Sequence, residues 1–542
     1  MVFTKGDWVV RVGVWPLIKG AICDLIAARL CRTDIAHRHC YSIAIVAFKV
    51  ALSWPLLSFW PLEMLMAHLQ FLVKPVSSLC NLECEYCFYL DLATHQQDKP
   101  RKMTREVLSL LMDRAAEYFI QEPNGKDGTK VTANGAATAA NGSDIKIIDG
   151  EHSVSFLFQG GEPTLAGVDF FKAVIEEQQR AFAKFNGRVP VFNSIQTNAC
   201  RLSEELVSLL SANHFFFGVS LDGPAHVHDA MRFYKNGRGS FEEVMKGIEL
   251  LRRYHAEFNI LCVVTDIVVK HIAEVYAFYK DHGFYNIQFI ACLDAFATMP
   301  PHPCTTDPKP SAIPFKAVEQ AEHYHDCSCA SNSSSDAADH APHSCGCTDN
   351  ATALRVASNT PASCASDAAK DASAVSDGKR FLSDEAYSEF LVKVFDLFYD
   401  DLINKGEYVS IRHIENYIAL LLNMEINACN MTGVCRIQNV IEASGKVYPC
   451  DFYAHDDFVL GDLKDNTLAQ IMNCQKAQQF VNTSRIENGS CLKCDYFKLC
   501  RGGCVREREN NVNIRCAAFK NFFAARLPKL QHAAAILSGM QG

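Results

Sequence analysis

Three cysteines lie close together in the segment CNLECEYC, directly after an apolar run: Cys80, Cys84 and Cys87. Thiolates at this spacing can hold three irons of a 4Fe–4S cluster and leave the fourth iron open to a small molecule. A zinc site would need a fourth cysteine or histidine, and none follows at zinc-finger spacing. Three unrelated loop cysteines are the remaining alternative. The pattern therefore favours an iron–sulfur site with one open position.

A larger set of cysteines lies near the C-terminus. It consists of eight cysteines with no histidine among them: Cys429, Cys435, Cys450, Cys491, Cys494, Cys500, Cys504 and Cys516. Eight thiolates divide into two sites of four ligands, which suits either iron–sulfur clusters or a zinc ribbon. The chain has 24 cysteines over 542 residues, whereas disulfide scaffolds are short and secreted. We therefore expect metal ligation in a reducing compartment, the cytoplasm.

The elements that must position these cysteines alternate between strands and helices from about residue 69 to 294. Strands are predicted within segments 70–80, 153–163, 189–198, 215–224, 258–265 and 285–294. Helices are predicted at 169–185, 202–213 with Ser203 as N-cap, 241–255 and 272–283. Repeated βα units predict a parallel sheet with helices outside, and chemistry collects at the carboxyl ends of its strands.

The second predicted strand ends in Gly160, Gly161, Glu162 and Pro163. Glycine has no Cβ, so the backbone here can approach a ligand closely. Alone, this motif is also typical of a tight turn. One strand after the cysteine triad, it is a much stronger indication of a binding site.

These motifs resemble those of the radical S-adenosylmethionine (SAM) enzymes. In that family SAM chelates the open iron, and its reductive cleavage gives methionine and a 5′-deoxyadenosyl radical that abstracts a substrate hydrogen. Within it, five segments resemble the anaerobic sulfatase-maturating enzymes: KPVSSLCNLECEYCFYL, LFQGGEPTLAG, SIQTNA, GVSLDGPAHVHDAMRFYKNGRGSFEEV and NIQFIACLD. The resemblance implies an α/β fold, a partial (β/α)6 TIM-like barrel. It also implies SAM contacts at Tyr86, Gly161, Ser220, Arg232 and Leu293.

The order of the C-terminal cysteines resembles the SPASM domain, which carries two auxiliary 4Fe–4S clusters. By this resemblance Cys429, Cys435, Cys450 and Cys504 hold one cluster. Cys491, Cys494, Cys500 and Cys516 hold the other. With the triad this makes three 4Fe–4S clusters, and full ligation implies that the auxiliary pair carries electrons.

Asp451 directly follows Cys450 in VYPCDFY. In the family this position is the proposed general base. A carboxylate beside a cluster ligand places proton and electron acceptors next to each other. Without the resemblance, a solvated turn aspartate is the alternative, and Asp222 in SLDGP would rank equally.

The resemblance implies that the chain oxidises a cysteine or serine of a sulfatase to Cα-formylglycine. It implies a sulfatase polypeptide with a Cys/Ser-x-Pro-x-Arg motif as substrate and a reduced flavodoxin- or ferredoxin-like electron donor. One alternative is a SPASM-type peptide maturase that forms thioether or carbon–carbon crosslinks. Another is a non-enzymatic zinc-binding protein. The net charge of −9 offers no basic field for nucleic acid.

Composition divides the chain further. Residues 1–66 form an apolar extension whose 42–61 stretch nearly reaches membrane-span length but holds Lys49 and two prolines. We expect it to lie upstream of a start at Met64 or Met66, and not to anchor the protein in a membrane. We expect a radical SAM core (67–302), a low-complexity insertion (303–379), a helical connection (380–428), the SPASM domain (429–520) and a C-terminal helix (521–542). Segments HYHDCSC and HAPHSCGC of the insertion are conceivable metal ligands.

Overall fold

The computed structural model describes residues 67–93, 101–120, 152–293, 381–487 and 489–539. The predictions for the apolar extension (1–66) and for the insertion at 303–379 fall outside these ranges. Within the described ranges, no helix combines the length and the apolar character needed to cross a membrane.

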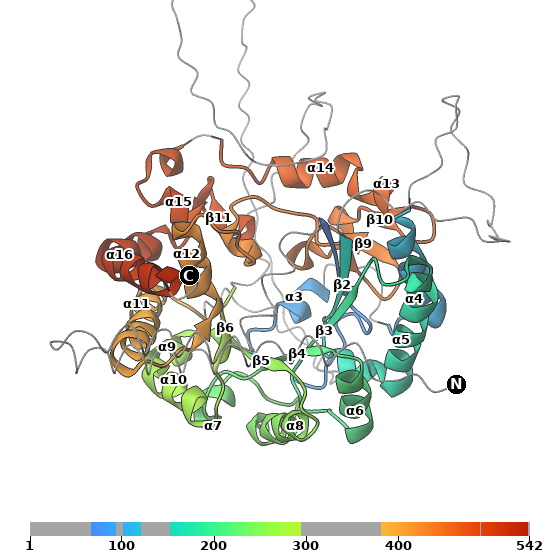
Figure 1. Cartoon of the computed structure of the whole chain (residues 1–542), viewed down its shortest axis with the longest axis horizontal. Coiled ribbons are helices and arrows are strands. Elements are labelled where there is room, and N and C mark those ends of the chain that lie inside the picture. Colours follow the sequence, from blue (N-terminus) through green and yellow to red (C-terminus); the bar gives the residue numbers. More distant parts are fainter. Residues whose placement is uncertain (1–66, 94–100, 121–151, 294–380, 488, 540–542) are drawn as a thin grey trace, which may run out of the picture. The chain divides into compact units, whose positions relative to one another are not determined.

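Six parallel strands, each paired with the next in chain order, form the centre of the fold (Figure 1). They are β1 (Ala67–Val73), β2 (His152–Phe158), β3 (Val191–Thr197), β4 (Phe216–Ser220), β5 (Phe258–Val264) and β6 (Asn286–Ala291). All six predicted strands are confirmed. Phe71, Phe156 and Phe217 are fully buried in them, as expected for a parallel sheet covered by helices.

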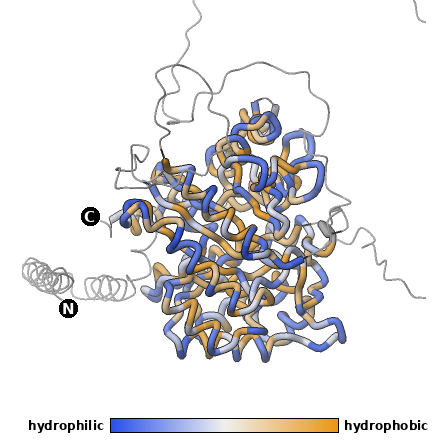
Figure 2. Tube along the Cα trace, turned by 90° about the vertical axis from the view of Figure 1, so that its right-hand side faces the viewer, coloured by the Kyte–Doolittle hydropathy of each residue, from blue (hydrophilic) through white to orange (hydrophobic). Residues whose placement is uncertain are grey.

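The helices of the βα units lie outside this sheet (Figure 1). They are α4 (Arg105–Glu117), α5 (Val168–Phe182), α6 (Glu204–Ala212), α7 (Ala225–His228), α8 (Phe241–Arg253), α9 (Asp266–Lys270) and α10 (Ile272–Asp281). Ser203 caps α6 as predicted, because its side chain accepts a hydrogen bond from the Leu206 backbone N–H. Figure 2 shows hydrophobic and hydrophilic residues interspersed along these elements, as amphipathic helices require.

The sheet is wider than six strands, which the sequence did not predict. Strand β7 (Ser410–Ile411) pairs with β6, and β8 (Val440–Ile441) pairs with β1, both in parallel. Strands β9 (Lys446–Tyr448) and β10 (Gly461–Asp462) continue the sheet beyond β8 in antiparallel pairing. Strands β8 and β9 form an antiparallel hairpin. Both edges of the six-stranded core are thus covered by later parts of the chain, which satisfies backbone groups that an open barrel would expose.

A short helix, α3 (Phe88–Ala93), follows the cysteine triad, and residues after 380 form further elements. They are α11 (Asp384–Asp400), a π-helical turn η7 (Asp401–Lys405), α12 (Arg412–Leu421), α13 (Leu468–Met472), α14 (Gln475–Asn482), α15 (Phe497–Cys500), the two-stranded β11 (Arg508–Glu509) and β12 (Val512–Asn513), and α16 (Cys516–Gly539). The C-terminal helix begins at Cys516, earlier than the predicted residue 521. The domain boundaries themselves stay predictions.

Candidate active site

The loop that carries the cysteine triad is held by the glycines that end β2. The Gly161 N–H donates to Ser77 O at 2.9 Å, and the Glu162 N–H donates to Leu79 O at 2.8 Å. A Cβ on Gly161 would lie 2.0 Å from Leu79 O, and Gly160 has a φ of +124°. Only glycine can lie this close to the backbone of the cysteine loop, so the glycine motif fixes the position of that loop.

The triad thiols lie near one another on this loop. The pKa of Cys80 is raised to about 12, chiefly by burial and to a smaller extent by the nearby Glu162 and Cys84. Burial raises the pKa of the Cys87 thiol, the backbone N–H of Tyr89 lowers it in part, and the nearby Cys80 thiol adds to the rise. Asn198, at the end of β3, donates a hydrogen bond to Cys80 Sγ at 3.7 Å. Three free thiols on one loop suit a three-cysteine cluster site.

Glu162 ties the ends of β2 and β3 together. Its buried carboxylate accepts hydrogen bonds from Thr164 Oγ1 at 2.6 Å, Thr197 Oγ1 at 2.7 Å and the Asn198 N–H at 2.8 Å. Burial nevertheless raises the pKa of Glu162, because desolvation outweighs these bonds. Glu162 therefore fixes Asn198 beside the cysteine loop.

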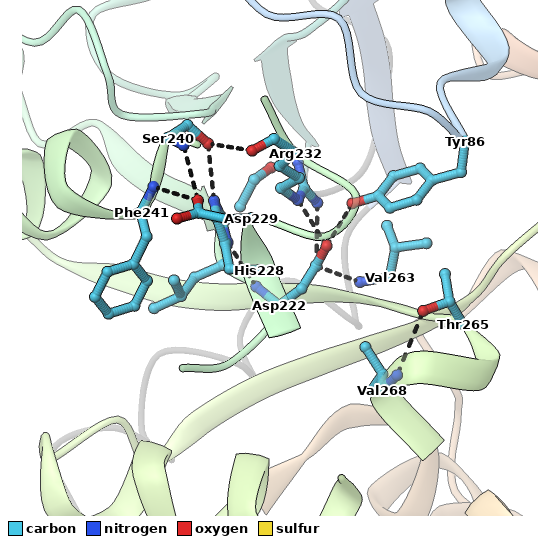
Figure 3. A network of polar contacts seen from close by, with 12 residues as sticks. Tyr86, Asp222, His228, Asp229, Arg232, Ser240, Phe241, Val263, Thr265 and Val268 are labelled. Atoms are coloured by element: carbon cyan, nitrogen blue, oxygen red, sulfur yellow. Dashed lines mark hydrogen bonds and ion pairs between the residues drawn. The ribbon is translucent and has the colours of Figure 1, made fainter. Parts of the chain in front are cut away.

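Tyr86 and Arg232, both predicted SAM contacts, meet at Asp222 (Figure 3). Tyr86 Oη donates to Asp222 Oδ2 at 2.5 Å, Arg232 Nε donates to the same oxygen at 2.8 Å, and the Val263 N–H donates to Oδ1 at 2.9 Å. Burial disfavours the carboxylate, but Arg232 outweighs it and holds the pKa of Asp222 below its usual range. This buried cluster joins the cysteine loop to β4 and β5.

A second layer of hydrogen bonds supports the cluster from behind (Figure 3). His228 Nδ1 accepts the Asp222 N–H at 3.2 Å, and its Nε2 lies 3.0 Å from Ser240 Oγ. Ser240 Oγ also donates to the Arg232 carbonyl at 3.0 Å. Hydrogen bonds to His228 and Ser240 thus hold the two ends of the segment from Asp222 to Arg232.

The other predicted SAM contacts lie at the carboxyl ends of strands. Ser220 is the last residue of β4, half-buried, and accepts a hydrogen bond from Gln196 Nε2 at 3.2 Å. Leu293 is half-buried just after β6. Gly161, Ser220 and Leu293 therefore lie at the end of the sheet that carries the cysteine loop.

Among the C-terminal cysteines, Cys450 and Cys500 each have three other thiols as electrostatic neighbours. Burial raises the pKa of the Cys450 thiol, and the next causes are the nearby thiols of Cys504, Cys429 and Cys435. The pKa of Cys500 is raised to about 11, chiefly by burial and then by the nearby thiols of Cys516, Cys491 and Cys494. The main causes of the pKa shifts of Cys450 and Cys500 include no thiol of the other group. Each group is a plausible four-ligand site.

The spacing within these groups favours clusters over zinc. Four sulfurs around one zinc at about 2.3 Å lie roughly 3.8 Å apart. Among the described residues, a single set of three or more potential ligands has all its ligand atoms within 4.8 Å of one another, and it contains no cysteine. No three of these cysteines therefore have the sulfur spacing of a single zinc site.

Asp451 lies in a buried polar network that includes Tyr89, which follows the cysteine loop. Tyr89 Oη donates a short hydrogen bond to Asp451 Oδ2, and Gln159 Nε2 donates to the same oxygen at 3.2 Å. Lys74 Nζ lies 3.8 Å from Oδ1 and 2.7 Å from Glu442 Oε1. Burial raises the pKa of Asp451, and Lys74 offsets this only in part.

One oxygen of this carboxylate is left for another partner. Asp451 Oδ1 is buried and accepts no hydrogen bond within the described part of the chain. A buried carboxylate oxygen without a donor is costly unless a ligand supplies one. Oδ1 of Asp451 is therefore suited to accept a proton from a bound molecule.

Sequence reasoning missed the residues that hold Asp451 and Cys80. Lys74, Tyr89, Gln159 and Asn198 all lie inside the motifs quoted above, next to the glycines and cysteines that drew attention. Glu442 lies far from these motifs in sequence. No motif quoted above includes Glu442.

Comparisons with known proteins agree with this geometry. A family model for the SPASM iron–sulfur cluster-binding domain matches residues 429–495. A cysteine-type anaerobic sulfatase-maturating enzyme of Clostridium novyi (strain NT) is 30% identical over 484 residues, covering 88% of this chain and 100% of the relative. A serine-type enzyme of Bacteroides thetaiotaomicron is 25% identical over 461 residues, covering 83% and 88%.

A solved structure gives the same result. Native anSMEcpe with bound AdoMet and Cp18Cys peptide matches with a TM-score of 0.62 and 29% identity, covering 87% of this chain and 100% of that one. The partial (β/α)6 barrel with a SPASM domain is thereby confirmed, and the alternative of a non-enzymatic zinc-binding protein is dropped. The described elements, the SPASM match and the 30% identity over nearly the whole chain show that it belongs to the anaerobic sulfatase-maturating enzymes, which are radical SAM enzymes with iron–sulfur clusters.

Proposed function

We propose that this chain oxidises a cysteine of a sulfatase to Cα-formylglycine with Asp451 as the general base. The observation that carries the proposal is the hydrogen bond from Tyr89 to Asp451. Tyr89 follows the triad closely, and Asp451 adjoins Cys450, so this bond joins the two expected cluster sites through one buried carboxylate. Cysteine is the preferred target because the cysteine-type relative is 30% identical and the serine-type relative 25%.

We assign the eleven cysteines named above to three 4Fe–4S clusters, one on the triad and two on the groups of four. When bound, the triad cluster with SAM supplies the group that abstracts hydrogen from the substrate Cβ. The mutual electrostatic influence of the thiols within each group supports this assignment. Reconstitution under anaerobic conditions should give about 12 irons per chain.

The protein's own residues then orient the substrate and remove a proton from its thiol. Asp451 Oδ2 is held by Tyr89 and Gln159, which leaves Oδ1 to accept the proton of the substrate thiol. Its raised pKa brings the base closer to neutral pH, where general-base catalysis is most effective. Lys74 favours the ionised carboxylate, because its positive charge offsets part of the effect of burial on the pKa of Asp451.

The predicted SAM contacts have separate supports. Tyr86 and Arg232 are fixed by Asp222, while Gly161, Ser220 and Leu293 lie at the carboxyl ends of strands. We propose a reduced flavodoxin- or ferredoxin-like protein as electron donor. We propose the cytoplasm as compartment, because thiolate ligands persist under reducing conditions.

The test is a peptide assay. Reconstituted holoenzyme, SAM and a reductant are incubated anaerobically with a Cys-x-Pro-x-Arg peptide or the matched Ser-x-Pro-x-Arg peptide. We expect the aldehyde product by mass, trapped with a hydrazine reagent, and faster formation from the cysteine peptide. Faster conversion of the serine peptide would overturn the assigned target. A crosslinked peptide without aldehyde would overturn the proposed reaction and favour a peptide-crosslinking maturase.

A further inference from the structure

Two histidines and a glutamate meet in the segments that follow β4 and β5, away from all the cysteine groups in sequence. His226 lies in α7, His271 is the N-cap residue of α10, and Glu274 lies in the first turn of α10 (Figure 1). His226 follows β4 and His271 follows β5, so the topology of two consecutive βα units brings them together. No part of the proposed reaction uses these three residues.

Their ligand atoms converge on one point. His271 Nδ1 lies 3.1 Å from Glu274 Oε2, and His226 Nε2 lies 3.5 Å from the same oxygen. The two imidazole rings are 4.9 Å apart between centroids and nearly perpendicular. All three ligand atoms lie within 4.8 Å of one another, and among the described residues this set alone has that property.

We propose that His226, His271 and Glu274 form a binding site for a divalent transition metal of the zinc class. Two imidazole nitrogens with one carboxylate oxygen are a donor set that zinc uses with an open fourth position. Imidazole also selects zinc, nickel and copper over magnesium or calcium, which prefer oxygen ligands. The Glu274 side chain is 51% exposed and His226 54%, so water can complete the coordination sphere.

The metal would tie α7 to α10. Helix α7 lies in the segment between Asp222 and Arg232, and His228, two residues after His226, accepts the Asp222 N–H. A bridge from His226 to α10 therefore holds the outer side of the segment whose inner side fixes Tyr86. Because the ion binds only the folded arrangement of α7 and α10, it stabilises the native state.

The experiment measures zinc binding to the reconstituted holoenzyme by anaerobic equilibrium dialysis against ZnCl₂, with metal analysis. Zinc that binds elsewhere on the chain contributes equally to the parent and to the variants, so the difference in stoichiometry reports this site alone. We expect His226→Gln, His271→Gln and Glu274→Gln each to bind one equivalent of zinc less than the parent. The control His255→Asn removes an exposed histidine elsewhere, at a φ of +52° that asparagine accommodates, and should keep the parent stoichiometry.

Iron content serves as the folding check for every variant, because these surface positions lie outside all three cysteine groups. A second readout is the thermal midpoint, which zinc should raise in the parent and in His255→Asn but not in the three site variants. Equal zinc stoichiometry in parent and site variants would overturn the site. Lost zinc with an unchanged midpoint shift would overturn the bridge between α7 and α10. Neither result depends on which peptide the enzyme oxidises.

Discussion

Replacing Lys74 with methionine tests the ion pair that supports the proposed base. Lys74 is 1% exposed, with Nζ 2.7 Å from Glu442 Oε1 and 3.8 Å from Asp451 Oδ1. Its Nζ also lies 5.0 Å from the centroid of the Tyr89 ring. Methionine keeps much of the apolar stem but removes the cation. Two buried carboxylates then face each other without this counter-charge.

The magnitude follows from burial and distance. Removing one partner of a buried ion pair typically costs about 3–5 kcal/mol, because the remaining charge is left uncompensated. Coulomb attraction falls with distance, so Glu442 carries the larger share of the loss. We expect Lys74→Met to lower the free energy of unfolding by about 3–5 kcal/mol. The double variant Lys74→Met/Glu442→Gln removes a charge of each sign and should recover most of it.

The assay pairs urea unfolding of the holoenzyme with aldehyde formation from the cysteine peptide. Aldehyde formation by Lys74→Met should fall at least about tenfold, because Asp451 loses the cation that partly offsets its burial. Lys393→Met is the matched control. Lys393 is 49% exposed and pairs with Glu389 one turn away, so its loss should cost less than about 1 kcal/mol. Parent-like stability and rate in Lys74→Met would refute this reasoning, as would a double variant no more stable than the single one.

Three further predictions follow from contacts elsewhere. Gly161→Ala places a Cβ 2.0 Å from Leu79 O, so it should displace the cysteine loop and remove about four irons per chain, measured by iron analysis; full iron content would contradict this. Arg232→Lys loses the two-pronged contact to Asp222 and should weaken SAM binding at least about tenfold in a titration, whereas an unchanged dissociation constant would argue against it. Asp401→Asn removes a buried carboxylate whose pKa is lowered because two lysines and a tyrosine outweigh its burial, and should cost about 1.5–3 kcal/mol in urea unfolding. That stability is complete above the unfolded pKa of about 3.9 and is lost only as pH falls through the lower folded pKa, so the cost should be constant from pH 6 to 8, and a cost that changes within this window would contradict the assignment.

The strand pattern and the motif spacing were readable from the sequence because each strand of the core is long enough to show an apolar run. β1 and β2 each have seven residues and end at recognisable motifs. The grouping of the C-terminal cysteines came from resemblance, since spacing alone allows several divisions of eight thiols. The thiols that influence Cys450 and Cys500 are consistent with this division, and the ligand assignment stays a prediction.

The edges of the sheet could not be predicted. β7 and β8 have two residues each, too few to show any periodicity. Yet β8 pairs with β1, and the Lys74 N–H donates to Ile441 O at 2.8 Å. That pairing brings Glu442 to Lys74 from a distant part of the sequence. The network that supports Asp451 therefore exists only once the sheet has formed, and no local pattern indicates it.

The zinc-class site has the same origin. His226 and His271 belong to different βα units and share no motif spacing. Their approach depends on α7 and α10 lying next to each other after β4 and β5. The histidine–cysteine segments of the insertion, which attracted attention in the sequence, lie outside the described residues.

The most direct test of the account uses a substrate peptide deuterated at the cysteine Cβ, with parent enzyme and Asp451→Asn side by side. Asparagine keeps the shape of the side chain and removes the base. The measurement is deuterium in 5′-deoxyadenosine together with aldehyde yield, by mass. We predict labelled 5′-deoxyadenosine from both enzymes, and aldehyde from Asp451→Asn reduced about 10²–10⁴-fold. Unlabelled 5′-deoxyadenosine from the parent, or aldehyde at the parent rate from Asp451→Asn, would contradict the account.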